Sequence, residues 1–500
     1  MISPILASLA LASALISQDL LIRDAIIVSP NVAISEMPLD VRVENGRITA
    51  IGEDLVALAS ETELNAAGLY LTPGLIDSHV HLGGNGGLRG DMVEENIALV
   101  RAYRRQEPRS YLYWGFTTLL DLTRSRPFVD HWNGLELSSQ LHACRAAPYA
   151  NGYGMMFEPE EYRYEAPYYI HDPDVAQSIP AEHDPAEHTP EAVVGRIADD
   201  GDAICIKTFH EPGFGGLFDF NTAPTEVLDR VAREAETRGL FNLLHATSLL
   251  SWHTAVEARA HVMAHGLWHW DQLNGAQVNP ETELPAQIED LLDATIENGI
   301  TVQLTTGAIH GEVALYDVDF LTSDALAATL PRELITWHSG PQGGWFRDNL
   351  ERIADDNPVV VENFLGHAPT GEPGETSRAA LRRVIAVGRY LHANGAELVL
   401  ASDTPSSPTY TNAPGLHGYQ EMLTMEQMDM IPSEVLAAAT INNARLLGLE
   451  DEIGSVEVGK QADLLLLSED PRNEISDMGS IRWVILDGRP VQREYLSAGN

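Results

Sequence analysis

The residues best suited to chemistry are two histidines two positions apart, His79 and His81, near the end of the run Leu71-Thr-Pro-Gly-Leu-Ile-Asp-Ser-His-Val-His-Leu82. The apolar character of this run predicts a short buried strand after a Pro-Gly turn. Because side chains alternate across a strand, both imidazoles face the same way. Imidazole is the commonest neutral metal ligand near physiological pH, although a buried pair satisfied by hydrogen bonds gives the same pattern.

Short apolar runs alternate with amphipathic segments through the middle of the chain. Strands are predicted over residues 75–81, 117–121, 146–153, 203–207, 241–245, 261–265, 301–305 and 397–403. Helices are predicted over residues 225–238, 287–298 and 378–394. Eight strands alternating with helices predict an α/β fold, a (β/α)8 TIM barrel. Such barrels place their chemistry at the C-terminal ends of the strands.

Polar side chains end five of these predicted strands. They are His79 and His81 on the first, Lys207 on the fourth, His245 on the fifth, His265 on the sixth and Asp403 on the eighth. Packing alone does not explain polar residues at five separate strand ends. Together they could surround one or two divalent ions with nitrogen and oxygen ligands.

The two ends of the chain have a purely β character. Apolar runs over 20–28 and 41–51 are joined by Asn45-Gly46, a hairpin-forming dipeptide, and similar runs recur at 462–467 and 481–489. We therefore expect residues 18–70 and 453–500 to form one small β-sandwich domain. Residues 71–452 would then form the barrel.

Two stretches of the predicted barrel resemble insertions, residues 158–198 and 307–372. Long loops in a compact domain are often functional, and each of these follows the C-terminal end of a predicted strand. This placement favours lids over the active site, with surface decoration as the alternative.

Residues 1–17 are apolar and small, with Ala-Ser-Ala at 12–14, which is typical of a secretory signal peptide, although no Lys or Arg precedes the run. A wrongly chosen start codon or an N-terminal strand would be the alternative. The segment predicts a periplasmic or secreted protein, and otherwise a cytoplasmic one. No cysteine directly follows this segment, and no other run is apolar enough to cross a bilayer. No membrane anchor is therefore expected. The two cysteines, Cys144 and Cys205, are expected to be buried thiols rather than a bridge.

The charge balance of the 500 residues is strongly acidic. Asp and Glu number 73 against 31 Lys and Arg, a formal net charge of −42. Such a surface repels phosphate backbones, which argues against a nucleic-acid partner. A small-molecule substrate is expected instead, and a homodimer is the default assembly.

Several motifs resemble the amidohydrolase superfamily, in its cyclic imidase, dipeptidase and imidazolonepropionase-like branches. The superfamily's Pro-Gly-x-Ile-Asp-x-His-x-His element corresponds to residues 73–81, and its Gly-x-Thr-Thr element to residues 115–118. Its closing element resembles residues 439–448, followed by residues 454–464. The combined motifs are highly specific and extend over nearly all of the chain after the first residues.

The resemblance implies two divalent ions, for which Zn fits the ligands best and Mn, Co or Fe are alternatives. His79, His81 and Asp403 would hold the more buried ion, and His245 and His265 the other. Lys207 would bridge them as a carbamate formed with CO2, because an ammonium would be repelled by two cations. A Lys207 that reaches solvent or pairs with Asp403 is the alternative.

The resemblance also implies a metal-dependent hydrolase that cleaves an amide or peptide-like C–N bond. A metal-bridging hydroxide would attack the carbonyl, and Asp403 would act as general base and then general acid. Asp77 would orient the strand or its ligands, or serve the fold alone. His210, Arg124 and Tyr410 are weaker candidates for substrate contacts.

Three other functions remain open. Lactone or ester hydrolysis would use the same centre. A deaminase usually carries a Glu three residues after the histidine of the fifth strand, and Ser248 stands there. A non-catalytic binding protein on the same barrel is disfavoured, because such relatives typically lose metal ligands.

Overall fold

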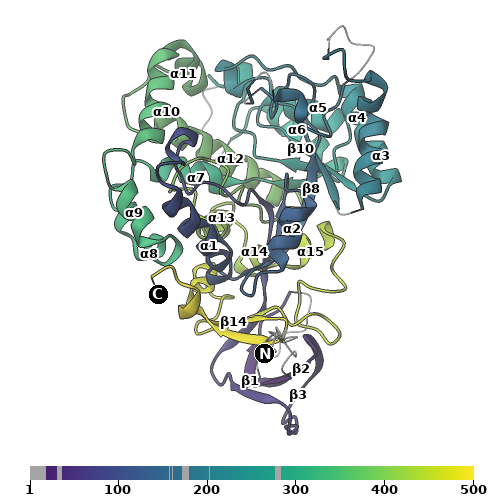
Figure 1. Ribbon diagram of the computed structural model, residues 1–500, viewed down its shortest axis with the longest axis vertical. Helices are drawn as coiled ribbons and strands as arrows, with labels where there is room; N and C mark the ends of the chain where they lie inside the picture. Colours follow the sequence, from purple (N-terminus) through teal and green to yellow (C-terminus); the bar gives the residue numbers. More distant parts are fainter. Residues whose placement is uncertain are drawn as a thin grey trace, which may run out of the picture.

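The computed structural model describes residues 19–499, apart from 31–36, 157, 160–161, 172–178, 202 and 276–282. Figure 1 shows a strand-rich unit at the lower end of the molecule and a larger α/β unit above it. The predicted signal peptide lies outside the described residues. Within the described part of the chain, no helix is both long and apolar enough to cross a membrane.

The lower unit combines strands from both ends of the chain, coloured purple and yellow in Figure 1. Its strands are β1 (Leu20–Ile27), β2 (Leu39–Glu44), β3 (Arg47–Gly52), β4 (Thr62–Asn65), β5 (Tyr70–Pro73), β13 (Leu464–Leu467), β14 (Ile481–Leu486) and β15 (Arg489–Gln492). They form a mixed sheet in the order β15-β14-β13-β5-β1-β2-β3, with β4 paired to β1. Asn45 and Gly46 join β2 to β3 with φ of 51° and 75°, the left-handed conformation that this dipeptide tolerates.

The upper unit contains a barrel of parallel strands. These are β6 (Leu75–Val80), β7 (Phe116–Asp121), β8 (Gln140–Ala146), β9 (Cys205–Phe209), β10 (Phe241–His245), β11 (Val262–Ala264) and β12 (Thr301–Gln303). Each pairs with the next in sequence order, so that β6 and β12 are the two edges of one seven-stranded sheet.

Residues 397–404 close the gap between the two edges. On one side Val302 donates its N–H to the carbonyl of Glu397 at 2.9 Å, and on the other His81 donates to Thr404 at 3.0 Å. This segment pairs only through isolated bridges, so the predicted eighth strand is extended chain in the expected place rather than a regular strand. The TIM-barrel fold is confirmed.

The prediction for the third strand was wrong. The strand is β8, Gln140–Ala146, and not residues 146–153. The later run is more apolar, but it contains Pro148, which cannot donate a ladder hydrogen bond. The observed strand contains the polar residues His142 and Arg145. They interrupt the apolar run from which a buried strand is predicted.

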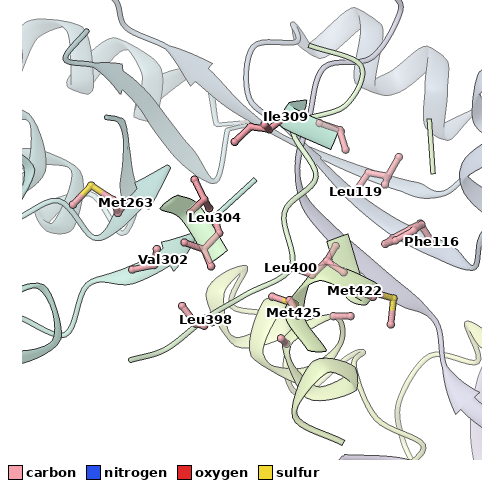
Figure 2. Packing of buried hydrophobic residues seen from close by; sticks show 14 of the residues in the cluster. Phe116, Leu119, Met263, Val302, Leu304, Ile309, Leu398, Leu400, Met422 and Met425 are labelled. Atoms are coloured by element: carbon pink, nitrogen blue, oxygen red, sulfur yellow. The ribbon is translucent and has the colours of Figure 1, made fainter. Parts of the chain in front are cut away.

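Helices surround the barrel. They are α1 (Ile97–Tyr113), α2 (Arg126–Asn133), α3 (Pro190–Asp200), α4 (Thr225–Thr237), α5 (Leu249–Glu257), α6 (Ala286–Glu297), α7 (Thr306–Ala314), α12 (Glu375–Ala393), α13 (Leu416–Glu426), α14 (Pro432–Ala438) and α15 (Ile441–Leu446). The three predicted helices correspond to α4, α6 and α12. Figure 2 shows side chains of α13, among them Met422 and Met425, packed with Leu400 beside the barrel strands.

The stretch 307–372 is largely helical rather than a loop. After α7 it forms α8 (Asp324–Thr329), α9 (Arg332–His338), α10 (Trp345–Asp356) and α11 (Pro358–Leu365). These helices lie along one side of the barrel, opposite α3 to α6 in Figure 1. His338 and Trp345 donate ring N–H groups to the carbonyls of Gly86 and Gly87, at 2.8 and 2.9 Å. The insertion thus supports the loop that follows β6.

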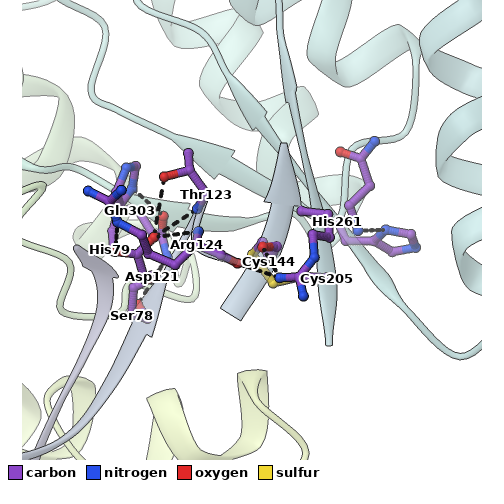
Figure 3. Close-up of a disulfide and its surroundings, with 11 residues drawn as sticks. Ser78, His79, Asp121, Thr123, Arg124, Cys144, Cys205, His261 and Gln303 are labelled. Atoms are coloured by element: carbon purple, nitrogen blue, oxygen red, sulfur yellow. Dashed lines mark hydrogen bonds and ion pairs between the residues drawn. A yellow bond between two sulfur atoms is a disulfide. The ribbon is translucent and has the colours of Figure 1, made fainter. Parts of the chain in front are cut away.

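Cys144 and Cys205 form a disulfide, so the prediction of two buried thiols was wrong. The two residues lie opposite each other on the neighbouring strands β8 and β9, with their Cα atoms 4.4 Å apart. Figure 3 shows the bridge between these strands. The predicted third strand began at residue 146 and left out Cys144. A pairing of residues 61 positions apart can be predicted only when both strands and their register are known.

Candidate metal centre

The predicted ligands converge at the C-terminal end of the barrel. Oδ1 of Asp403 lies 3.3 Å from Nε2 of His79 and 3.1 Å from Nε2 of His81. Its other oxygen lies 3.6 Å from Nδ1 of His265. The ring centroids of His265 and His245 are 4.4 Å apart. Single ligand atoms of His79, His265 and Asp403 all lie within 4.8 Å of one another, a spacing that suits a shared cation.

Four buried polar atoms of this cluster have no hydrogen-bond partner among the described residues. They are Nε2 of His79, Nζ of Lys207, Nε2 of His245 and Oδ1 of Asp403. Buried polar atoms in proteins are almost always paired. Three of these atoms are possible ligand atoms, and the fourth, Nε2 of His245, faces Oε2 of Glu211 at 3.4 Å. Four such exceptions on predicted ligand residues at one place fit a cation-binding site.

The protonation states also suit cations. Burial lowers the pKa of His79 to about 3 and that of Lys207 to about 7, and it lowers the pKa of His245 and His265 as well. Burial alone would raise the pKa of Asp403, but the neighbouring histidines outweigh it and hold the pKa well below its ordinary value. Neutral nitrogens and an ionised carboxylate are the forms that bind metal.

Gln303, at the end of β12, orients His79. Its Oε1 lies 3.0 Å from Nδ1 of His79, while its Nε2 donates to the carbonyl of Ser78 at 3.0 Å. The amide oxygen must therefore accept, so that Nδ1 carries the proton and Nε2 is left to bind an ion. Figure 3 shows this contact. Sequence reasoning missed Gln303, although it too is a polar residue at the end of a strand.

Asp77 ties the two ligand-bearing segments together beneath the centre. Its Oδ1 accepts the backbone N–H groups of His79 and Ser402 at 3.2 and 3.0 Å, and its Oδ2 accepts the Ser402 hydroxyl at 2.5 Å. Burial raises the pKa of Asp77 to about 7. This contact fixes His79 relative to Asp403, which follows Ser402 directly.

Two further contacts orient the remaining histidines, and both were missed. Oε2 of Glu211 lies 3.4 Å from Nε2 of His245. Nδ1 of His265 lies 2.9 Å from Oγ1 of Thr305. From the sequence, Glu211 could be placed at the barrel mouth only because it stands four residues after Lys207. No local pattern connects it to His245, which lies 34 positions later.

Left-handed backbone marks three non-glycine residues of the site. The φ angles are 79° at His265, 51° at Thr305 and 53° at Asp403. Such residues are uncommon and store strain that the surrounding structure must hold. Here they turn the chain at strand ends, so that the side chains enter one common space.

A recess lies in the loops that follow His81 and Asp403. Residues 84–88, 405–410 and 412–414 line it together with Tyr103 and Leu330, and it encloses about 210 Å³. Gly87, with φ of 83°, has no room for a side chain, because an added Cβ would lie 2.7 Å from the Tyr410 nitrogen. These residues are called the recess below.

The three candidate substrate contacts lie in different surroundings. Tyr410 lines the recess. Arg124 donates to the carbonyl of Leu82 and lies over the ring of Phe128, 5.1 Å from its centroid. The ring of His210 faces α5, with Nδ1 3.0 Å from the Ser251 hydroxyl. This placement favours Tyr410 and does not favour His210, and all three contacts stay predictions.

The comparisons with known proteins agree with this geometry. A model of the Amidohydrolase family matches residues 358–491. A dihydroorotase of Geobacter sulfurreducens is 48% identical over 64 residues, 13% of this chain and 15% of the relative. An imidazolonepropionase of Symbiobacterium thermophilum is 43% identical over 75 residues, 14% and 18% of the two chains. The matched segments thus span less than a fifth of either relative.

Solved structures match over much more of the chain. A Xaa-Pro dipeptidase, crystallised with methionine in its active site, superimposes with a TM-score of 0.64. The match covers 95% of this chain and 100% of that chain at 18% identity, which identifies the fold. Residues 358–491 thus match the Amidohydrolase family, and the motifs at residues 73–81 and 439–464 resemble the amidohydrolase superfamily over a shared fold.

Proposed function

We propose that the protein is a metal-dependent hydrolase that cleaves an amide C–N bond. Two divalent ions, with Zn as the best fit, would be held by His79, His81, Asp403, His245 and His265, and a carbamate on Lys207 would join them. The observation that carries the proposal is the set of four buried polar atoms, each on a predicted ligand residue, without hydrogen-bond partners among the described residues.

The ions, when bound, would activate a water molecule and polarise the substrate carbonyl. The chain's own contribution is the proton transfer: Asp403 takes a proton from the attacking water and delivers it to the leaving nitrogen. Its contacts with three histidines hold its carboxylate in place, and its lowered pKa keeps it ionised before it accepts the proton.

The environment of Lys207 supports carbamate formation. Its side chain is buried, with a residue exposure of 2%, and burial keeps its amine largely neutral at pH 8. A neutral amine is the form that adds CO2. The chain contains only two lysines, Lys207 and Lys460, although arginine is frequent. Arginine cannot lose its charge in this way, which explains a lysine at this position.

Ester or lactone hydrolysis is the second candidate, because the same centre would serve it. Deamination is disfavoured because Ser248 stands where a deaminase usually carries a proton-shuttling Glu. The Ser248 hydroxyl instead accepts the N–H of Ser251 at 3.2 Å and caps α5.

Metal content and carbamate formation test the proposal directly. We expect about two Zn per chain by plasma mass spectrometry, with marked loss in Lys207→Ala and no loss in the matched control Lys460→Ala. Incubation with ¹³C-bicarbonate should give one carbamate carbon signal in the wild type and none in Lys207→Ala. With two lysines in the chain, the signal is assigned without ambiguity. Two Zn retained by Lys207→Ala would contradict the bridging role.

We also propose export to the periplasm or the medium. The disulfide supports it, since such bridges are rare in reducing compartments. Cell fractionation with the native N-terminus would test this, and a cytoplasmic pool with reduced Cys144 and Cys205 would overturn it.

A further inference from the structure

Resting on the amide hydrolysis proposed above, we propose a substrate class for this centre. The substrate is an uncharged amide whose acyl half carries an aromatic or bulky apolar group, and whose amine half is small and bears no carboxylate. An aromatic surface beside His245 and an uncharged recess in the loops that follow His81 and Asp403 carry this inference.

The aromatic surface lies beside His245. The ring of Tyr153 stacks on the His245 imidazole, 4.6 Å between centroids at 27°. Phe209 and Phe214 lie 6.0 and 6.3 Å from the same imidazole, and Phe220 lies 5.9 Å from Tyr153. Tyr153, Phe209, Phe214 and Phe220 are called the aromatic wall below.

The wall stands at the barrel mouth rather than in the core. Phe209 ends β9, Phe214 and Phe220 lie in the loop after it, and Tyr153 follows β8. All four are only partly buried. Aromatic rings held at the edge of a site offer apolar area and favour edge-to-face or stacked contact with another ring. The wall therefore suits an aromatic or bulky apolar group of a ligand.

The recess differs in chemistry. Among the described residues its lining includes no acidic, basic or histidine side chain, and its polar groups are hydroxyls and amides such as Ser406, Tyr410 and Asn412. A carboxylate buried there would have no cation to offset its lost hydration. The recess therefore suits a neutral group.

The arginines near this region have acceptors. Arg104 touches the recess lining and donates to the Gly84 carbonyl and to Oδ1 of Asn85, both at 3.1 Å. Arg124 donates to the Leu82 carbonyl, and Arg145 donates to the carbonyl of Arg124. On α10, Arg347 pairs with Asp348 at 3.0 Å. Nε of Arg124 has no hydrogen-bond partner among the described residues, but it lies 3.7 Å from the Asp121 carboxylate. These contacts argue against a free carboxylate on the substrate.

The position of Asp403 sets the direction of the substrate. Asp403 delivers the proton to the leaving nitrogen, and only Thr404 separates it from the recess residues that begin at Pro405. The amine half therefore lies in the recess, and the acyl half extends toward His245 and the wall. Water adds across the C–N bond: its hydroxyl joins the acyl carbon, its remaining proton goes to the nitrogen, and a neutral amine leaves.

Kinetics on three matched amides test the class. For the zinc-loaded enzyme we expect kcat/KM for N-phenylacetylglycinamide to exceed that for N-acetylglycinamide by tenfold or more, which reports the acyl half. The kcat/KM for N-phenylacetylglycinamide should also exceed that for N-phenylacetylglycine by a similar factor, and this second ratio measures the effect of a carboxylate on the amine half. Equal or higher kcat/KM for N-phenylacetylglycine or for free dipeptides would overturn the inference while leaving amide hydrolysis intact.

A binding measurement separates this inference from catalysis. In 1-phenylbutan-2-one a CH2 replaces the amide NH, so it cannot be hydrolysed. By calorimetry it should bind at least tenfold more tightly than butan-2-one, even if no amide proves to be a substrate. Equal affinities would overturn the proposed acyl site.

Variants locate the effect. Phe214→Ala and Tyr153→Leu should each remove most of the preference for the phenyl compounds, in binding and in kcat/KM, without loss of Zn. Asp219→Ala is the matched control, because this exposed residue lies on the same loop and is not aromatic. A preference that persists in both wall variants would place the aromatic group elsewhere and contradict the proposal.

Discussion

Glu211 lies with its Oε2 3.4 Å from Nε2 of His245, which leaves Nδ1 of that imidazole to bind an ion. The carboxylate is itself held by the backbone N–H groups of Gly213 and Phe214, at 2.8 and 2.6 Å. Burial would raise the pKa of Glu211, but His245 and these donors lower it to about 2. The loop after β9 therefore fixes both the orientation and the tautomer of a predicted ligand.

Glu211→Gln should weaken one of the two ions. The amide keeps an acceptor for the backbone N–H groups but loses the charge that holds His245. Partners of this kind typically change metal affinity by roughly 10- to 100-fold. Competition with a chelator of known affinity should release about one Zn per chain earlier than in the wild type. The exposed Asp219, changed to Asn on the same loop, should release Zn as the wild type does.

The buried carboxyl of Glu421 should make the stability of the fold depend on pH. Glu421 of α13 accepts the Thr306 hydroxyl and the Gly307 N–H, both at 2.6 Å, and burial raises its pKa to about 8 from 4.5. Because the folded form binds this proton more tightly, the stabilisation is complete below pH 4.5 and is lost as the pH rises through 8.

The variant Glu421→Gln lacks this titration. Between pH 5 and pH 8 its Tm should fall less than that of the wild type, by an amount equivalent to about 1 kcal/mol per pH unit. Calorimetric scans at both pH values measure the difference. The exposed Glu297→Gln on α6 should follow the wild type. Parallel wild-type and Glu421→Gln profiles would show that Glu421 ionises in the folded protein near its usual pKa.

The convergence of the predicted ligands could be predicted from the sequence because a strand end is a local feature. His79, Lys207, His245, His265 and Asp403 each follow a short apolar run, and the barrel brings such ends to one edge. The residues that orient them could not be found in this way. Gln303 and Glu211 act on histidines of other strands, and their role depends on side-chain directions that no local pattern encodes.

The barrel was predictable for the same reason. Its third strand was placed wrongly, because tertiary context there outweighs the local pattern. The strand β8 carries His142 and Arg145, while the more apolar run after it contains Pro148. The disulfide depends on this strand's register with β9, and it therefore escaped prediction.

Removal of the bridge should destabilise the barrel. The disulfide closes a loop of 61 positions, for which the chain-entropy model gives about 4 kcal/mol. We expect Cys144→Ala with Cys205→Ala to lower the free energy of unfolding in guanidinium by up to that amount. Thiol titration of the denatured, unreduced wild type should find no free thiol. Two free thiols, or a variant as stable as the oxidised protein, would contradict the bridge.

Gly87→Ala should damage substrate binding without removing metal. A Cβ at this position would lie 2.7 Å from the Tyr410 nitrogen, 2.8 Å from the Thr409 carbonyl carbon and 2.9 Å from Cε1 of His338. The backbone there has φ of 83°, which also disfavours alanine. The recess must deform, so we expect kcat/KM to fall tenfold or more, mainly through KM, at unchanged Zn content. Gly90→Ala is the matched control, because nothing lies within 4 Å of its added Cβ. Unchanged kinetics in Gly87→Ala would mean that the amine half of the substrate does not occupy the recess.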